Sequence, residues 1–464
     1  NLRPPPTRSG AQQQDRIGAP LSNPGLFGRP MKRHDTPSDV AVALARHAPR
    51  VIASLLDPSA GIGNLILPLA RRLEQQGTSV YCVDSDAQAV RGLVARIGAT
   101  LPRGTKVVHA DFLTWASERS RPRFDCVVMN PPFAGVKSKL CPLVIRTAIG
   151  FEQERIFMPL EAAFVWHAIE LLKRGGRLLA VLPCSIVMGE TTQWLRDYML
   201  SIGAVRAVHE LPPRCFPGVE SRMYLMVFDK GISSQRIELL NHDLREPERI
   251  VLDVQEPPGT TRLDFGYVSA ALRLQRLLRR KRLDWRKLGT VATFWRGDIE
   301  SPLGPRVAVH STDYSSGFWT ASERHRRSVA KESSRVIRRG DLLITRVGRN
   351  AHDTIGSAIG LQGMPCSDCV VAIRPNNSRE SLRLLFALRA LLHQGWAKPL
   401  LERGTGASYI SQRSLADLQI PMAASTLYSR QFHEFRSAER TRDRNRSLAA
   451  VSTASKYLGT TVAK

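Results

Sequence analysis

The chain has 464 residues, of which 43% are hydrophobic and 6% aromatic, so it can bury the cores of two or three domains. Lys and Arg number 67 against 41 Asp and Glu, and the net charge of +26 favours a polyanionic partner, most simply nucleic acid. Seven scattered cysteines, an odd number, argue against a disulfide framework, and no run approaches the ~18 apolar residues of a membrane span. We therefore expect a cytoplasmic protein without a membrane partner.

Residues 1–33 are rich in Pro, Gly, Gln and Arg, lack the apolar core of a secretory signal, and predict a flexible segment. From Thr36 to about Asp229, short β-rich runs alternate with helical stretches. This alternation predicts a doubly wound, mostly parallel α/β sheet whose ligand-binding loops share one edge. The predicted strands are residues 51–56, 80–84, 106–111, 124–130, 177–183, 204–211 and 224–229.

The pattern changes in the second half of the chain. Residues 230–265 predict a linking segment, and residues 270–283 predict a basic helix. From Trp285 to about Met422, short β-like runs with many turns predict a mixed α/β unit, followed by a polar helix at residues 430–447. The predicted domains are residues 1–33, 34–265, 266–425 and 426–464.

The strongest local motif is Asp-Pro-Ser-Ala-Gly-Ile-Gly at residues 57–63, between an apolar run and a helical stretch. Its glycines, Gly61 and Gly63, allow the backbone to approach a ligand, and the following helix offers free N–H groups. The next two strands end in Asp84 and Asp111. Acids in these positions favour a nucleoside-containing cofactor, although a tight turn and surface acids are the alternatives.

A second motif, Asn-Pro-Pro-Phe at residues 130–133, directly follows an apolar strand. The prolines stiffen the turn, so the side-chain oxygen of Asn130 and the carbonyl oxygen of Pro131 can together hold one NH₂ group. Phe133 offers a face on which a planar ring can stack. The motif therefore predicts a site for an exocyclic amine, with a rigid strand-capping loop as the alternative.

Over about residues 34–230 the sequence resembles the gamma class of DNA adenine methyltransferases, which use S-adenosylmethionine and modify the exocyclic amino group of adenine. The resemblance implies a seven-stranded methyltransferase sheet, catalysis in a loop that holds a flipped adenine, and double-stranded DNA as substrate. The implied cofactor-binding residues are Thr36, Pro37, Asp57, Ser59, Gly61, Gly63, Asp84, Asp111 and Phe112. The implied catalytic residues are Asn130, Pro131, Pro132 and Phe133, with Phe133 and Phe216 stacking on the base.

The second half has a resemblance of its own. Motifs at residues 285–289, 340–346, 407–411 and 418–421 resemble, in order, the target recognition domain of type I restriction specificity subunits. Residues 262–349 hold 20 Lys and Arg against 8 Asp and Glu, a net charge of +12, as a DNA-facing unit requires. For any single arginine, a solvated surface position is the alternative.

These observations lead to one interpretation and two alternatives. The interpretation is a site-specific adenine-N6 DNA methyltransferase of a restriction-modification or related defence system, with a restriction nuclease or other defence subunits as further partners. The alternatives are an RNA or protein-glutamine methyltransferase with the same loop, and a non-catalytic DNA-specificity subunit. We expect no metal site, because the lone Cys-x-x-Cys at residues 366–369 lacks a second pair.

Overall fold

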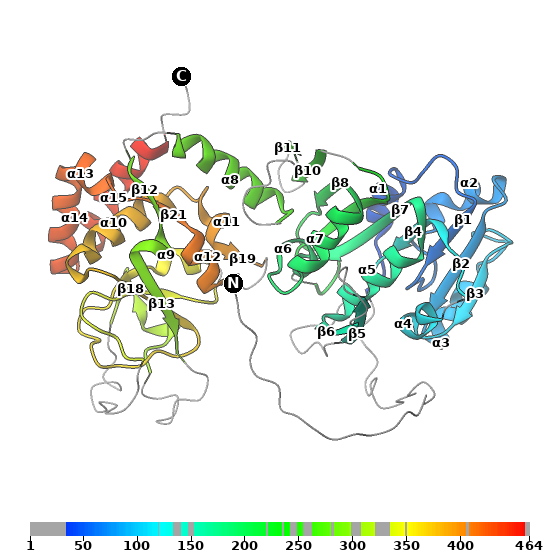
Figure 1. The fold of residues 1–464 in the computed structure, drawn as a ribbon, viewed down its shortest axis with the longest axis horizontal. Helices are drawn as coiled ribbons and strands as arrows, with labels where there is room; N and C mark the ends of the chain where they lie inside the picture. The colour runs from blue at the N-terminus through cyan, green and yellow to red at the C-terminus, as the bar shows by residue number, and fades with distance from the viewer. Residues whose placement is uncertain are drawn as a thin grey trace. The chain divides into compact units, whose positions relative to one another are not determined.

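One large sheet organises the first half of the chain (Figure 1). In the computed structural model the described residues are 34–118, 120–132, 141–146, 153–219, 221–233, 236–241, 248–253, 262–279, 283–297, 308–320, 335–348, 350–404 and 408–459, without side chains at 141–146, 153–156 and 457. The strands of this sheet are β1 (Ser54–Asp57), β2 (Ser79–Asp84), β3 (Lys106–His109), β4 (Phe124–Met129), β7 (Leu172–Pro183), β8 (Gly203–Glu210), β9 (Met223–Lys230), β10 (Arg236–Asn241) and β11 (Glu248–Asp253).

The nine strands run in the order β11-β10-β8-β9-β7-β4-β1-β2-β3. Pairing is parallel from β3 through β7, whereas β9 lies antiparallel between β7 and β8. All seven predicted strands are present, and the predicted doubly wound, mostly parallel sheet is confirmed. The segment predicted as a link, residues 230–265, adds two further strands, with β10 parallel to β8 and β11 antiparallel to β10. A separate hairpin of β5 (Cys141–Arg146) and β6 (Gln153–Met158) follows β4.

Helices cover both faces of this sheet. Successive side chains of each strand point to opposite sides, so apolar side chains on both faces are buried under helices. Leu55 of β1 belongs to one core cluster and Leu56 to the other. The Leu55 face packs against α1 (Ser38–Ala45), η1 (Leu67–Leu69), α2 (Ala70–Gln75) and α3 (Ala87–Val94). The Leu56 face packs against α4 (Phe112–Ser117), α5 (Leu160–Leu171), α6 (Cys184–Met188), α7 (Gln193–Ile202) and the first turns of α8 (Phe265–Leu278).

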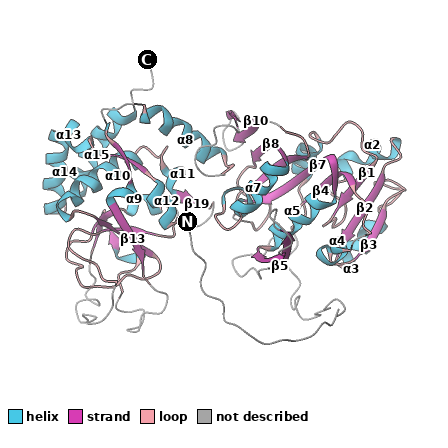
Figure 2. Ribbon diagram, viewed as in Figure 1, coloured by secondary structure: helices cyan, strands magenta, loops and turns pink. Residues whose placement is uncertain are grey.

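The second half is a mixed α/β unit, as predicted, with its own hydrophobic clusters (Figure 2). A four-stranded antiparallel sheet has the order β13 (Ala292–Arg296), β18 (Val370–Pro375), β16 (Leu342–Thr345) and β17 (Gly356–Ser357). Two-stranded pairs join β12 (Trp285–Lys287) to β21 (Gln419–Pro421), β14 (Tyr314–Ser315) to β15 (Phe318–Trp319), and β19 (Glu402–Arg403) to β20 (Tyr409–Ile410). The helices are α9 (Leu288–Val291), η3 (Ser311–Asp313), η5 (Ala351–Thr354), η6 (Ser378–Glu380), α10 (Ser381–Leu392), α11 (Lys398–Leu401), α12 (Gln412–Asp417), α13 (Ala424–Leu427), α14 (Ser429–Thr441) and α15 (Arg444–Gly459).

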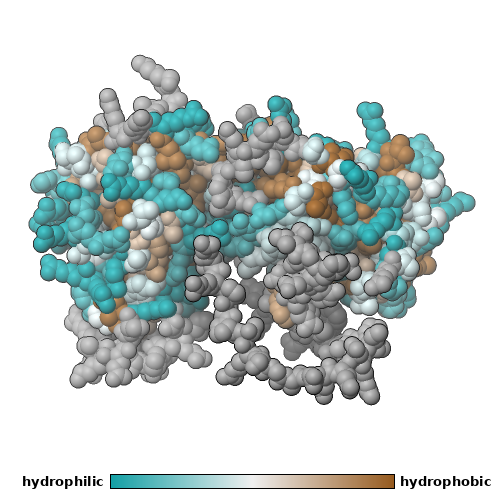
Figure 3. Space-filling model, in the orientation of Figure 1, coloured by the Kyte–Doolittle hydropathy of each residue, from teal (hydrophilic) through white to brown (hydrophobic). Residues whose placement is uncertain are grey.

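The polar segment predicted as one helix near residues 430–447 forms parts of two helices, α14 and α15. Arg442, between them, has a left-handed backbone with φ of 56°, which turns the chain. Hydrophilic residues predominate over α14 in the space-filling view, as expected for a solvated face (Figure 3). Within the described ranges, no helix is both long and apolar enough to cross a membrane.

Contacts join residues 34–464 into one unit, so the predicted boundary at residue 265 stays a prediction. Leu263, Phe265 and Val268, which flank that boundary, pack into the core of the first half. The first turns of α8 are therefore part of the structure that supports the large sheet.

Asp229 of β9 ties together three strands of the large sheet. Its carboxylate accepts two hydrogen bonds from Arg177 of β7, at 2.6 and 2.9 Å, and one from Arg206 of β8 at 2.9 Å. The Asp229 side chain is only 3% exposed. Burial alone would raise the pKa of Asp229, but the bonds from the two guanidinium groups hold it below its usual value.

We expect Asp229→Asn to lower the free energy of unfolding by about 3 kcal/mol, because it leaves two arginines without a buried counter-charge. The exposed ion pair between Arg430 and Glu434 provides the control, and Glu434→Gln should change stability by less than about 0.5 kcal/mol. Denaturant unfolding monitored by circular dichroism measures both. Equal effects of the two substitutions would show that the Asp229 cluster does not hold the strands together.

Candidate functional site

The carboxyl ends of three adjacent strands bring the predicted site residues together. Strand β1 pairs in parallel with β2 on one side and with β4 on the other. Asp57 ends β1, Asp84 ends β2, and Asn130 follows β4. Parallel strands place their carboxyl ends on one edge, so these three residues lie side by side where α/β sheets bind ligands.

The glycine turn after β1 lies against the end of β2. Gly61 and Gly63 have φ of 55° and 85°, in the left-handed region that favours glycine. A Cβ atom on Gly63 would come within 2.9 Å of the side chains of Leu93 and Leu101. The Gly61 N–H donates to Asp84 Oδ2 at 2.7 Å, so the turn is held directly beside the predicted ribose-binding acid.

Asp57 is buried under this turn, with 1% of its surface exposed. Its Oδ1 accepts the Ser59 N–H at 3.1 Å, whereas Oδ2 has no hydrogen-bond partner among the described residues. Burial raises the pKa of Asp57 to about 8; the Ser59 bond opposes this shift and the negative charge of Asp84 adds to it. A ligand that supplies a positive charge or a hydrogen-bond donor here would favour the ionised form.

Asn130 is held by its amino group, which leaves its side-chain oxygen available. Its Nδ2 donates to Thr36 Oγ1 at 2.9 Å and to the His34 carbonyl at 3.2 Å. A carbonyl can only accept, so the atom facing His34 must be the nitrogen. Oδ1 is buried and lacks a hydrogen-bond partner in the described part of the chain. The site thus presents one oriented, unsatisfied acceptor at the sheet edge.

The predicted Thr36-Pro37 motif therefore contacts the predicted catalytic loop. Thr36 is 6% exposed, and its carbonyl accepts a bond from Asn64 Nδ2 at 3.2 Å. Pro37 precedes the first turn of α1. Ser59 closes the same group of contacts, because its Oγ donates to the Asn130 carbonyl at 3.0 Å. The turn, the upstream motif and the loop after β4 form one bonded group.

The structure gives Asp111 and Phe112 local roles. Asp111 caps α4, and its Oδ1 accepts bonds from the Thr114 N–H at 2.8 Å and the Thr114 hydroxyl at 2.9 Å. Phe112 is 2% exposed and its ring centroid lies 5.0 Å from that of Phe164 in the core. Both residues lie at the expected sheet edge, but cofactor contact by either one stays a prediction.

Of the two aromatic residues predicted to stack on a base, the structure describes Phe216. Pro131 is buried and Pro132 half-buried, while Phe133 lies outside the described residues. Phe216 is 1% exposed and belongs to the core cluster that includes Val40 of α1. In this structure Phe216 packs in the core, and stacking on a base would require its ring to leave that cluster.

Glu161 and Ser185 form a pair near the predicted catalytic loop that the sequence motifs do not predict. Glu161, at the start of α5, is 5% exposed and accepts the Ser185 hydroxyl at 2.8 Å. Burial raises the pKa of Glu161. Strand β7, which precedes Ser185, pairs with β4 with Met129 opposite Ala180, so Ser185 follows the strand end next to Asn130. The one available signal was Glu161 near the start of a largely apolar helix that also carries His167 and Glu170.

Metal ligands do not gather at this edge. The structure shows no group of three or more His, Cys, Asp or Glu side chains placed to hold a metal among the residues it describes. The arrangement instead offers carboxylates, backbone N–H groups and one amide oxygen, which are partners for an organic ligand with hydroxyl and amino groups.

The sheet and this edge define a doubly wound α/β fold with its candidate site at the carboxyl ends of the strands. The N-6 DNA Methylase family model matches residues 32–251, a segment that contains the whole site described above. Type II methyltransferase M.PstI of Providencia stuartii is 24% identical over 171 residues, which cover 33% of each chain. Type II methyltransferase M.TthHB8I of Thermus thermophilus is 26% identical over 222 residues, covering 46% of this chain and 48% of that one.

The chain therefore spans between a third and about half of the length of these two relatives. A solved structure, the type IIG restriction endonuclease BpuSI, is similar with a TM-score of 0.40 and 14% identity, covering 91% of this chain and 65% of that one.

The raised pKa of Asp57 makes stability depend on pH. The folded chain holds the Asp57 proton up to about pH 8, whereas the unfolded chain loses it near 3.8, so this group destabilises the fold increasingly as pH rises between those values. We expect Asp57→Asn, which resembles the protonated acid, to melt within about 2 °C of the wild type at pH 5 and several degrees above it at pH 8. Differential scanning calorimetry at both pH values measures this. A melting difference that does not grow with pH would mean that Asp57 is ionised in the fold.

Proposed function

We propose that the chain is a site-specific DNA methyltransferase that transfers a methyl group from S-adenosylmethionine to the N6 amino group of adenine, within a restriction-modification or related defence system. The observation that carries the proposal is the oriented, unsatisfied oxygen of Asn130 beside the glycine turn and Asp84. The match of residues 32–251 to the N-6 DNA Methylase family supports it.

The residues present fit the proposed cofactor. S-adenosylmethionine, when bound, supplies a methyl group activated on a positively charged sulfonium. Asp57 has an unsatisfied buried oxygen and a raised pKa, so a cation nearby is the partner that would ionise it. Asp84 already accepts backbone N–H groups from Gly61 and Asp86, and its remaining lone pairs would accept ribose hydroxyls.

The catalytic role of Asn130 follows from its orientation. Its Oδ1, with the adjoining Pro131 carbonyl, would accept hydrogen bonds from the two N–H groups of the target amine. An amine held in this way directs its lone pair toward the methyl carbon, and proximity and alignment then supply most of the rate. After transfer, the extra amine proton leaves to solvent, so no covalent enzyme intermediate is required.

A duplex hides the adenine amine, so the target base must be flipped into the pocket. Phe133 would stack on it, with Phe216 as a second candidate after rearrangement. The excess of +12 over residues 262–349 supports the second half as the part that meets DNA. We propose that it acts as a target recognition domain.

Removal of the Asn130 amide tests the mechanism. We expect Asn130→Ala to lower the rate of methyl transfer by about 10²–10³, because one preorganised partner at the reacting centre is lost. Transfer of tritium from labelled cofactor to duplex DNA gives the rate, and calorimetry with S-adenosylhomocysteine checks that cofactor affinity is retained.

Asn241→Ala, on strand β10 between β11 and β8 and away from the β1, β2 and β4 ends, is the matched control and should retain full activity. Activity of Asn130→Ala within a few-fold of the wild type would remove Asn130 from the mechanism. Transfer of label to RNA or protein instead of DNA would favour the alternative substrates.

DNA binding by the basic half predicts a steep dependence on salt. For each phosphate contact, affinity should fall by about 0.9 log units per log unit of salt. The fall should be the same for specific and nonspecific duplexes. Substitution of a phosphate-contacting arginine should flatten this slope by about one unit. Loss of a residue that contacts base edges should instead reduce the difference in binding free energy between specific and nonspecific duplexes by about 1–3 kcal/mol. Fluorescence anisotropy across a salt series measures both quantities. Affinity that does not change with salt would contradict DNA recognition by these charges.

A further inference from the structure

The short helix α6 connects the catalytic edge to the second half of the chain. It begins directly after Pro183, the last residue of β7. Because β7 pairs in parallel with β4, with Met129 opposite Ala180, α6 begins beside the loop that carries Asn130. A displacement of α6 would therefore shift the proposed catalytic loop as well.

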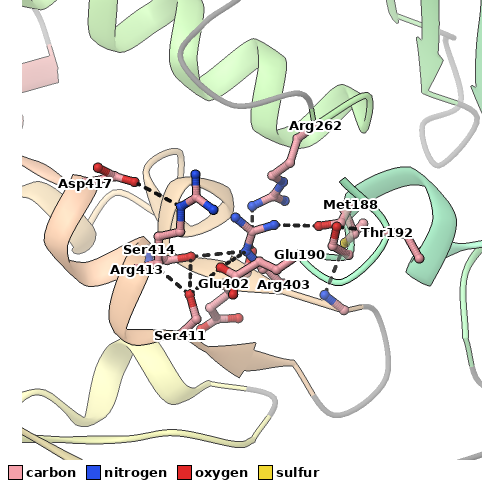
Figure 4. Close-up of polar contacts among 12 residues, drawn as sticks. Met188, Glu190, Thr192, Arg262, Glu402, Arg403, Ser411, Arg413, Ser414 and Asp417 are labelled. Atoms are coloured by element: carbon pink, nitrogen blue, oxygen red, sulfur yellow. Dashed lines mark hydrogen bonds and ion pairs between the residues drawn. The ribbon is translucent and has the colours of Figure 1, made fainter. Parts of the chain in front are cut away.

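Two buried arginines bind the carbonyl groups at the far end of α6. Arg196 of α7 donates to the Ile186 and Gly189 carbonyls, each at 2.7 Å. Arg403 of β19, in the second half, donates to the Met188 carbonyl at 2.6 Å (Figure 4). The last carbonyls of a helix lack partners within the helix, so these guanidinium groups cap it.

Arg403 reaches this helix together with its neighbours on the second half. Its Nε lies 3.2 Å from a carboxylate oxygen of Glu190, and the Ser411 hydroxyl donates to the same Glu190 oxygen at 2.6 Å. The Gly404 N–H approaches the Met188 sulfur at 3.1 Å. The turn at residues 188–190 is thus bound by β19 and by the first turn of α12 (Figure 4).

The residue before Arg403 is bonded in turn to the interior of the second half. The Glu402 carboxylate accepts bonds from His352, through its backbone N–H at 2.9 Å and Nδ1 at 2.5 Å, and from the Ser408 hydroxyl at 2.7 Å. Arg262, which lies before the predicted boundary at residue 265, donates to the Pro399 and Glu402 carbonyls at 2.9 and 3.2 Å and so also joins the two halves. The position of Arg403 is therefore set by the second half.

Simple adhesion between the two halves does not require this arrangement. Arg196, Arg262 and Arg403 are each at most 5% exposed, and their like charges repel one another. Asp264 pairs with Arg262, and Glu190 pairs with Arg403. Burial, followed by the charge of Arg403, lowers the pKa of Arg196 to about 10. Apolar side chains would join two surfaces without this repulsion, and what the arginines add is a defined geometry.

We propose that Arg403 is a positioning residue through which the second half sets the place of α6 and of the catalytic edge beside it, so that methyl transfer depends on the state of the recognition half. This inference rests on the proposed function. Arg403 is buried and its guanidinium faces protein groups, so it acts on turnover and makes no contact with DNA phosphate.

The experiment compares Arg403→Met with Arg403→Lys in single-turnover methylation of duplex DNA by the full chain. We expect Arg403→Met to lower the rate by about 10- to 100-fold, since displacement of a catalytic group by about 1 Å has effects of that order. Arg403→Lys keeps a charged donor and should recover part of the loss. Dissociation constants for S-adenosylhomocysteine and DNA, and the salt slope, should stay within about twofold of wild type, since neither ligand touches Arg403.

Arg430→Met is the matched control, because Arg430 is exposed on α14 and lies outside the proposed recognition domain. It should leave rate and affinities unchanged. An Arg403→Met rate equal to wild type, or a salt slope flattened by one unit, would overturn the positioning role.

Glu190→Gln is a milder test if Arg403→Met fails to fold, because Gln keeps an acceptor for Ser411 but loses the charge that pairs with Arg403. It should lower the rate by about three- to tenfold with unchanged cofactor affinity, and an unchanged rate would contradict the proposal. Amide hydrogen exchange over residues 184–192 tests the positioning role of Arg403 separately from the proposed methyltransferase function. Faster exchange there in the Arg403 or Glu190 variants supports the coupling even if the wild type transfers no methyl group to DNA, whereas unchanged exchange overturns it.

Discussion

Because β1 pairs in parallel with both β2 and β4, residues that are distant in the chain meet at one edge of the sheet. Asp57, Asp84 and Asn130 each occupy the position where their strand ends. The glycine turn can lie on Asp84 only because the two strand ends are adjacent, and Ser59 can bond the Asn130 carbonyl for the same reason. The chemistry of the edge follows from the strand order.

Two buried oxygen atoms at this edge lack the hydrogen bonds that buried polar groups normally have. Asp57 Oδ2 and Asn130 Oδ1 have no partner in the parts of the chain that the structure describes. Asp229 in the same sheet, by contrast, binds two arginines with both oxygens. An unsatisfied buried polar atom costs stability, and two such oxygens at adjacent strand ends favour a ligand-binding edge.

The sequence allowed the sheet and its edge to be predicted, because alternating apolar runs and strand-end acids are local signals. The orientation of Asn130 was not accessible in this way, since it depends on the His34 carbonyl and Thr36, which are brought near only by folding. The direction of the Phe216 ring was equally inaccessible from the sequence. A Phe-Pro motif cannot show whether its ring faces a pocket or the core cluster in which it lies.

Arg403 shows why the connection between the halves escaped motif analysis. Its partner Met188 is 215 residues away in the chain, and the bond is to a backbone carbonyl, which leaves no signature in either side chain. In a chain of net charge +26, a single basic residue is first interpreted as a solvated surface residue or a contact for nucleic acid. Burial reverses that interpretation. The Arg403 guanidinium contacts Met188, Glu190 and Ser414, so its charge binds groups of the protein and is not exposed to a nucleic acid. In the proposed function, charge that recognises DNA and charge that positions the catalytic edge would be carried by the same residue type and would differ in solvent exposure.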